Sequence, residues 1–364
     1  MSLQKESEII TIVSPGRVCL FGDHQDYLGL PVIACAINKH ITLTAYPNTN
    51  ETFVIDMPDI DVTRTINIHD SFTTLTPRDY FASGIRVVKK YECFPNRGFN
   101  LSFKGNIPIN AGLSSSSAMV VSWIHFLFKA YGVDREITSD FIAQVAYEAE
   151  VLEHASPGGK MDQYTIGIGD IIFIETGDHF SYRKIPVTIN GLVVGESGIP
   201  KETIGLLGNL QERTWDAINH VARKASDFNL HKATLENVEQ YYQYIPENLQ
   251  PLFYAAIKNH TITQQALSSL EKSILNPQEI GTLMTAHHDV LKNILKITVP
   301  VIDQMIEAAL NAGAYGAKIV GSGGGGSIVA LAPSGKEEHI ASAMRDAGAK
   351  SAYSVTIEKG THEQ

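Results

Sequence analysis

The segment that most constrains this chain is a loop of small residues, Pro108–Ala118 (PINAGLSSSSA), that leads into an apolar stretch at helical spacing, Ala118–Tyr131. Such a loop brings free backbone N–H groups and the positive end of a helix dipole to one point, where phosphate binds readily. The alternative is a flexible turn with a serine N-cap, which is a commoner feature. It is not a Walker A loop, because no Gly-Lys-Ser/Thr follows. The loop predicts a helix and, in the first interpretation, a phosphate cradle whose cation comes from elsewhere.

A second run of small residues, Gly321–Gly326 (GSGGGG), lies between two strand-like segments, 318–320 and 327–331. Six small residues in a row let the backbone approach another chain segment or a phosphate closely. A tight hairpin is the competing interpretation. A dinucleotide-binding loop is disfavoured, because its glycines should open a helix, whereas these lead into a strand near the C-terminus.

A glycine-rich turn, Pro157–Tyr164 (PGGKMDQY), directly follows a helix-like stretch, Ser139–His154, that carries three glutamates. Asp162 in this turn is a candidate general base, and a glutamate on the preceding helix is a candidate metal ligand. The alternative is that Asp162 caps the next segment and that the glutamates form a solvated face.

Near the N-terminus, Ser14–Tyr27 (SPGRVCLFGDHQDY) reads as a strand after Pro-Gly that ends in a polar turn. Asp23, His24 and Asp26 lie at positions i, i+1 and i+3, where short polar side chains can converge on sugar hydroxyls. Arg17 can pair with a nearby carboxylate. An ordinary Asp-rich turn is the alternative.

The remaining pattern predicts a β-rich first part and a helical block over residues 203–310, with a change in composition near residues 170–190. The expected strands are 9–13, 17–21, 40–46, 53–68, 98–104, 171–175 and 192–195.

Length and charge exclude several classes of protein. The 364 residues suggest about two domains, and 44% apolar residues are enough for a large core. A net charge of −10 argues against non-specific nucleic-acid binding and a polybasic membrane surface. The three cysteines form no disulfide framework, and neither a secretory leader nor a membrane-spanning run is evident. We therefore expect a cytoplasmic protein.

The four motifs, in this order, resemble those of the GHMP kinases, and most closely the galactokinases. Ser14–Tyr27 resembles the galactokinase signature, Pro108–Ala118 the phosphate loop, and GKMDQY (159–164) the segment with the catalytic aspartate. GAYGAKIVGSGGGGS (313–327) resembles the third motif of the family. The resemblance extends over almost the whole chain.

The resemblance implies a role for individual residues. Asp162 falls at the base that takes the proton from the sugar 1-hydroxyl, and Arg17 at the arginine that pairs with it. Ser116 and Glu150 fall at the ligands of Mg²⁺. Asp23, His24 and Asp26 fall at the sugar-contacting positions, beside Arg17 and Asp162. The residues expected at ATP are Pro108, Ala111, Gly112, Leu113, Ser114, Ser115, Ser116, Ser117, Gly323 and Gly324.

Three positions depart from the galactokinase pattern. Asp23 stands where galactokinases carry glutamate, and Lys160 where they carry an apolar residue. In the segment Thr203–Asp216, aligning Arg213 with the last family arginine places Asn209 at the position of a sugar-contacting tyrosine. Such changes in a hydroxyl-reading pocket can change the preferred sugar.

The resemblance implies an α+β fold in two lobes, 1–180 and 181–364. The N-terminal lobe would hold a left-handed βαβ crossover, and the C-terminal lobe would be ferredoxin-like. The expected activity is ATP-dependent phosphorylation of galactose to galactose 1-phosphate, by direct in-line transfer with Asp162 as base and with Mg²⁺. The alternatives are a kinase for a related hexose, hexosamine, uronic acid or pentose, a mevalonate kinase, and an inactive regulator that binds sugar and ATP. We expect a monomer or weak homodimer.

Overall fold

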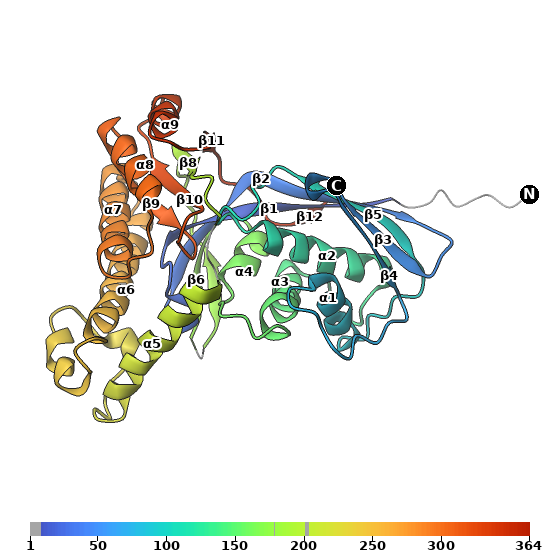
Figure 1. Cartoon of the computed structure of the whole chain (residues 1–364), viewed down its shortest axis with the longest axis horizontal. Coiled ribbons are helices and arrows are strands. Elements are labelled where there is room, and N and C mark those ends of the chain that lie inside the picture. Colours follow the sequence, from blue (N-terminus) through green and yellow to red (C-terminus); the bar gives the residue numbers. More distant parts are fainter. Residues whose placement is uncertain (1–8, 178, 201–203) are drawn as a thin grey trace, which may run out of the picture.

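A computed structural model describes residues 9–177, 179–200 and 204–364 of the chain. It is a mixed α+β structure with two sheets, each covered by its own helices (Figure 1). The larger sheet has the order β12-β1-β2-β5-β3-β4, and β6 pairs with β2 and with β7. Its strands are β1 (Ile10–Phe21), β2 (Val32–Pro47), β3 (Thr52–Met57), β4 (Val62–Asn67), β5 (Phe99–Gly105), β6 (Ile171–Glu175), β7 (Ser181–Lys184) and β12 (His362–Glu363).

Four helices lie together on one face of this sheet (Figure 1). They are α1 (Tyr80–Lys89), α2 (Ser115–Tyr131), α3 (Ser139–Tyr147) and α4 (Met161–Ile168). The central helix is α2, whose Trp123 and Phe126 pack against Phe53 of β3. Because α2 is buried between sheet and neighbouring helices, its sequence is apolar nearly all round, as expected for such a helix.

The smaller sheet has the order β11-β8-β10-β9, and each of its neighbouring pairs is antiparallel. Its strands are β8 (Leu192–Glu196), β9 (Gly316–Val320), β10 (Ser327–Leu331) and β11 (Ser351–Val355). The helices α7 (Pro277–Asn293), α8 (Pro300–Asn311) and α9 (Glu337–Asp346) pack against it. This strand order, with helices before β9 and before β11, is the ferredoxin-like arrangement expected for the C-terminal lobe.

The predicted helical block is confirmed as α5 (Ile204–Ala222), α6 (Gln250–Leu270), α7 and α8. Short 3-10 turns, η4 (Leu230–Lys232) and η5 (Val238–Tyr244), join α5 to α6. The helix expected over 139–154 is shorter than predicted, because α3 continues as a π-helical turn, η3 (Glu148–Leu152). Such turns often occur at functional sites, and this one carries Glu150.

The chain does not change sheets at a single point. β7 still pairs with β6 of the larger sheet, and β12 returns from the C-terminus to pair with β1. Isolated bridges join Ile37 to Ile357 and Gly169 to Lys359. The division 1–180 and 181–364 stays a prediction, and residues 357–364 lie with the first sheet rather than the second.

Cys19, Cys35 and Cys93 are free and buried, in agreement with the absence of a disulfide framework. In the part of the chain that the structure describes, no helix combines the length and apolar character needed to cross a bilayer. Residues 1–8, on which the expectation about a leader partly rests, lie outside the described residues, as does Thr203.

Candidate active site

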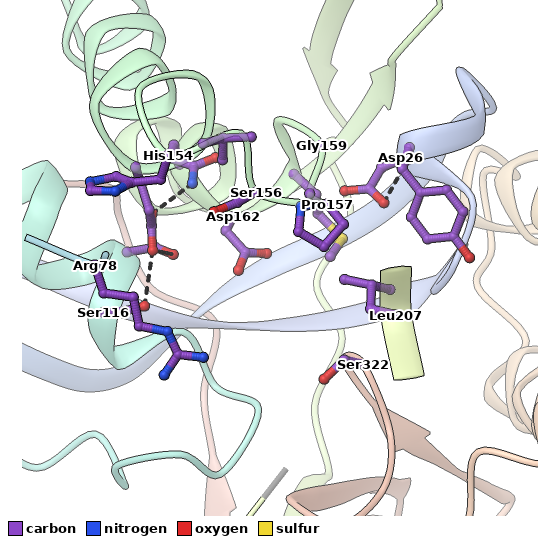
Figure 2. A pocket seen from close by; sticks show the side chains of 18 of the residues that line it. Asp26, Arg78, Ser116, His154, Ser156, Pro157, Gly159, Asp162, Leu207 and Ser322 are labelled. Carbon is purple, nitrogen blue, oxygen red and sulfur yellow. Dashed lines mark hydrogen bonds between the residues drawn. The ribbon is translucent and has the colours of Figure 1, made fainter. Parts of the chain in front are cut away.

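A cavity of about 680 Å³ opens where elements of both sheets meet. Its walls come from the end of β1 and the following turn η1 (Asp26–Leu28), the loop before α2, η3, the start of α4, α5 and the glycine loop 321–326. Figure 2 shows Ser116 and Arg78 on one side of Asp162, and Asp26 and Leu207 on the other. The cavity therefore has two chemically different ends.

The loop before α2 adopts a strained path that only a few residue types accept. Asn110, Gly112 and Ser114 all have positive φ, at 57°, 83° and 60°. A Cβ on Gly112 would lie 3.0 Å from the carbonyl oxygen of Val320, so this close approach requires glycine. The helix begins at Ser115, three residues before the predicted start.

The glycine loop 321–326 joins β9 to β10 as a hairpin and lies against the loop before α2. A Cβ on Gly326 would meet the carbonyl oxygen of Ala111 at 3.1 Å. The structure thus combines both interpretations of the glycine run, a hairpin and a close approach to another chain segment. Gly323 and Gly324 approach Ile297 instead: the N–H of Gly324 donates to its carbonyl oxygen over 2.8 Å.

Arg17 and Asp162 form the centre of the cavity. Arg17 donates from Nε to Oδ1 of Asp162 at 2.7 Å and from Nη2 to Oδ2 at 2.9 Å. Its Nη1 donates to the carbonyl oxygen of Gly112 at 2.5 Å. Burial by itself lowers the pKa of Arg17, but Asp162 outweighs it, so that this pKa is raised and the guanidinium stays charged.

The alternative interpretation of the loop, a turn whose serine caps the helix through its side chain, does not hold for Ser114. Its hydroxyl makes no capping hydrogen bond to α2 and donates to Oδ2 of Asp162 at 2.5 Å. Asp162 does not cap a helix either, since it lies in the first turn of α4. Asp162 is therefore bonded to two elements far away in the sequence, and a quarter of its side chain is exposed to the cavity.

Glu150 faces the first residues of α2. Ser116 and Ser117 donate to its Oε1 at 2.9 and 3.0 Å, and Gln163 donates to its Oε2 at 2.7 Å. Burial raises the pKa of Glu150, and hydrogen bonds from these neutral groups only partly oppose this. Glu150 is thus buried and hydrogen-bonded, and does not lie on the solvated face that the alternative interpretation required.

The residues at this point suit Mg²⁺. Ser116 and Glu150 offer hard oxygen ligands, and Mg²⁺ typically takes one or two such protein ligands together with phosphate and water. Oε1 of Gln163 is buried beside them and has no hydrogen-bond partner. Among the described residues no cluster of three or more His, Cys, Asp or Glu could hold a metal by itself, so a cation here requires further oxygen ligands from a bound molecule.

Of the three predicted sugar-contacting residues, two are bonded to the glycine loop. Asp23 accepts from Nζ of Lys318 at 2.5 Å and from the backbone N–H of Gly321 at 2.7 Å. Nε2 of His24 donates to the carbonyl oxygen of Ser322 at 3.1 Å, and its Nδ1 accepts from the hydroxyl of Tyr27. Burial lowers the pKa of His24, which keeps the ring neutral.

Asp26 is the member of the three whose carboxylate faces the cavity near Asp162 (Figure 2). Its Oδ1 accepts from the N–H of Tyr27 at 2.9 Å. Burial and the nearby Asp162 raise its pKa to about 6. Gly159 lies so close that a Cβ there would be 2.4 Å from Oδ2 of Asp26. Only glycine at position 159 lets the turn pass this close to the carboxylate of Asp26.

Lys160 and Asn209, two positions that differ from the galactokinase pattern, both lie outside the cavity. Lys160 does not reach the cavity: its ammonium lies 4.1 Å from the ring centre of Phe180 and donates to Gln144. Asn209 is exposed and does not line the cavity, and α5 contributes Leu207 there instead. Trp215 connects α5 to the turn η1, since its Nε1 donates to the carbonyl oxygen of Tyr27 at 3.1 Å.

Among the residues of this site that sequence reasoning missed are Lys318, Arg78 and Leu207. Lys318 stood inside the third motif, but a lysine in a strand gives no sign that it is buried. Arg78 and Leu207 belong to no motif. A signal for Arg78 was available in the sequence Thr-Pro-Arg-Asp before an apolar helix, which is typical of a turn and a helix start.

Family models match three parts of the chain. Residues 79–170 match the GHMP kinases N terminal domain, residues 266–350 match GHMP kinases C terminal, and residues 3–47 match the galactokinase galactose-binding signature. The three matches contain the cavity residues from Arg17 to Asp26, the loop before α2, Asp162 and the glycine loop.

Mevalonate kinases and galactokinases are both among the similar proteins. The mevalonate kinase of Pyrococcus furiosus is 28% identical over 350 residues, covering 92% of each chain. The galactokinase of Haemophilus influenzae is 28% identical over 351 residues, covering 93% of this chain and 88% of its own. The galactokinase of Lactococcus lactis, solved with galactose, superposes with a TM-score of 0.87 at 21% identity, covering 98% of this chain and 95% of its own. The mevalonate kinase of Methanococcus jannaschii has a TM-score of 0.68 at 22% identity, covering 98% and 100%.

Proposed function

This chain belongs to the GHMP kinases, which are ATP-dependent, and we propose that it phosphorylates a hydroxyl group of a neutral sugar, with galactose as the leading candidate. The observation that carries the proposal is the position of Asp162. It is held by Arg17 and Ser114 between the phosphate loop and an acceptor end that contains a second carboxylate, Asp26.

The charge of the acceptor end favours a neutral polyol. Arg17 is occupied by Asp162 and Gly112, and both ring nitrogens of His24 are hydrogen-bonded. Among the described cavity residues near Asp26, none offers an unengaged positive charge to a carboxylate on the substrate. A substrate with its own carboxylate, such as mevalonate or a uronic acid, would be repelled by Asp26 and Asp162. Sugar hydroxyls, in contrast, can donate to both carboxylates.

The reaction then follows from the geometry of the site. Asp162 accepts the proton of the attacking hydroxyl, as a general base within hydrogen-bond reach. Arg17 orients Asp162 through two hydrogen bonds. The N–H groups at the start of α2 hold the charge of the transferred phosphoryl group. Ser114 fixes Oδ2 of Asp162 through its hydroxyl. No covalent enzyme intermediate is needed.

Ser116 and Glu150 would hold the Mg²⁺ ion of the nucleotide. When bound, this ion neutralises charge on the phosphate oxygens during transfer. Gln163 and Ser117 orient the Glu150 carboxylate for that role through the hydrogen bonds described above.

Mevalonate kinase is the second candidate, because several relatives at 25–28% identity carry that name. The signature of residues 3–47 and the acidic acceptor end favour a sugar instead. Asn209, which aligns with the sugar-contacting tyrosine of galactokinases, does not line the cavity, and Leu207 does. An amino sugar, a pentose and a deoxy sugar are therefore tested beside galactose.

A coupled ADP-release assay with ATP and Mg²⁺ tests the proposal. The panel contains galactose, N-acetylgalactosamine, arabinose, fucose, galacturonate, glucuronate and mevalonate. We expect turnover on a neutral sugar, a fall of about 10²–10⁴-fold in kcat for Asp162→Asn, and no change for Asp170→Asn, a half-exposed aspartate outside the cavity that is paired with Lys184. Turnover on mevalonate or a uronic acid alone would contradict the neutral-sugar proposal. A sugar that raises the melting temperature without turnover would favour a regulator.

A further inference from the structure

Arg78 is a basic cavity residue to which neither the four motifs nor the proposed mechanism gives a role. It lies in the turn before α1 and lines the cavity together with Ser116 and Glu150. Figure 2 shows its guanidinium extending past Ser116 into the open part of the cavity, on the side of Asp162 away from Asp26. Its place is therefore the phosphate end rather than the acceptor end.

The backbone of Arg78 is held in an unfavourable conformation. Its φ is 63°, in the left-handed region that a residue with a Cβ rarely adopts. Such a conformation persists only where neighbouring contacts fix it, and ligand-binding sites are one of the places where it recurs.

The contacts that fix this turn come from the next residue, Asp79. Both oxygens of Asp79 accept from Arg64, at 2.6 Å each, and Oδ1 also caps α1 by accepting from the N–H of Ala82 at 3.0 Å. Burial raises the pKa of Asp79, but the hydrogen bonds from Arg64 and Ala82 lower it by more than burial raises it. The pKa of Asp79 is therefore below its ordinary value. Asp79 is charged and is hydrogen-bonded to both Arg64 and the start of α1, and it thereby keeps Arg78 turned toward the cavity.

The balance of charge at this end leaves Arg78 available. Glu153 is bonded to Arg86 and Lys90, and Arg17 is bonded to Asp162. Among the described residues that line the cavity, Arg78 is the arginine or lysine for which the structure shows no ion pair with a carboxylate. An exposed guanidinium beside a phosphate loop is suited to bidentate contact with phosphate oxygens.

We propose that Arg78 binds the β- or γ-phosphate of the nucleotide and is the side-chain cation that the lysine-free phosphate loop lacks. Backbone N–H groups at the start of α2 supply dipoles but no full charge, and Arg78 supplies that charge from a separate element. Asp79 and Arg64 act as positioning residues for it. The inference rests on the ATP-dependent activity of the family and not on which sugar is the acceptor.

Calorimetric titration with MgATP, MgADP and AMP, without sugar, tests this role. For Arg78→Met we expect the Kd of MgATP and MgADP to rise about 10–100-fold and that of AMP to change less than about twofold, because AMP has no β- or γ-phosphate. Arg78→Lys should recover part of the affinity, since lysine keeps the positive charge but lacks the paired N–H donors that let a guanidinium contact two phosphate oxygens at once. Arg223→Met, which removes an exposed arginine outside the cavity, serves as the control.

The outcomes separate this inference from the proposed function. Unchanged MgATP affinity in Arg78→Met would overturn it, whatever the sugar assay shows. An equal loss for AMP would place Arg78 at the base or α-phosphate and would also overturn it. Asp79→Ala should weaken MgATP binding as well while its circular dichroism stays that of a folded protein, and unchanged binding in that variant would overturn the positioning role of Asp79.

Discussion

Nζ of Lys318 lies 2.5 Å from Oδ2 of Asp23, and the exposed fractions of the two side chains are 0% and 1%. Lys318 is in β9 of the smaller sheet, whereas Asp23 follows β1 of the larger one. Lys318 also donates to the carbonyl oxygens of Cys19 and Ile319, so that its three protons are all used. Together with the N–H of Gly321, this ion pair ties the two sheets together beside the cavity.

Breaking this ion pair from one side should destabilise the protein strongly. Lys318→Met leaves Asp23 buried without a counter-charge, and we expect the free energy of unfolding to fall by about 3–5 kcal/mol. The double variant Asp23→Leu/Lys318→Met should recover much of that loss, because no lone charge remains. Urea unfolding measures both. Lys184→Met, which breaks the exposed pair with Asp170, should cost at most about 1 kcal/mol. A similarly small cost for Lys318→Met would contradict the role of the ion pair.

The raised pKa of Asp26 should make the stability of the sugar-free protein depend on pH. Because its folded pKa, about 6, exceeds the ordinary value of 3.8, the folded state binds more protons between these two values. The stabilisation from this proton is present at low pH and is lost as pH rises through about 6. We expect Asp26→Asn to be more stable than wild type by about 2 kcal/mol at pH 7.5, with the difference vanishing near pH 4. Unfolding curves at both pH values test this, and a difference independent of pH would contradict it.

Removing the hydroxyl of Ser114 should impair catalysis more than binding. Ser114→Ala loses the hydrogen bond to Oδ2 of Asp162 but keeps the helix start, since the side chain does not cap α2. We expect kcat to fall about tenfold with little change in the KM of either substrate and a melting temperature near that of wild type. The control is Ser268→Ala, in an exposed serine of α6. A large loss of stability without loss of kcat would show that Ser114 is structural.

Replacing Glu150 should change the requirement for Mg²⁺. Glu150→Gln keeps the size of the side chain but removes the charge, and we expect the Mg²⁺ concentration at half-maximal activity to rise at least about tenfold. The rise in melting temperature with ADP should need correspondingly more Mg²⁺, which gives a readout independent of turnover. Glu175→Gln, an exposed glutamate of β6, should leave both unchanged. An unchanged Mg²⁺ dependence would remove Glu150 as a ligand.

Lys160 should matter for local stability and not for catalysis. Its ammonium lies near the rings of Phe180, Tyr147 and Tyr164, away from the cavity. We expect Lys160→Met to keep kcat and both KM values within about twofold and to change the free energy of unfolding by no more than about 1 kcal/mol. A tenfold fall in kcat would instead assign Lys160 to the reaction.

The sequence by itself determined the features that depend on near neighbours along the chain. Apolar spacing predicted most strands and the helical block, and a loop of small residues before an apolar helix predicted the start of α2 to within three residues. The resemblance of the four motifs predicted one site for Arg17, Asp162, Ser116 and Glu150. In the structure all four line one cavity, with Arg17 bonded to Asp162 and Ser116 bonded to Glu150.

Only the tertiary structure decided what a polar side chain bonds to when its partner is far away in the sequence. Asp23 and His24 fit a sugar-binding turn equally well, yet the fold brings Lys318, Gly321 and Ser322 against them from nearly 300 positions away. The same holds for Arg78, which the pair Arg64–Asp79 aims into the cavity. Burial and long-range hydrogen bonds arise only when the chain is packed. They cannot be predicted from residue type and local spacing.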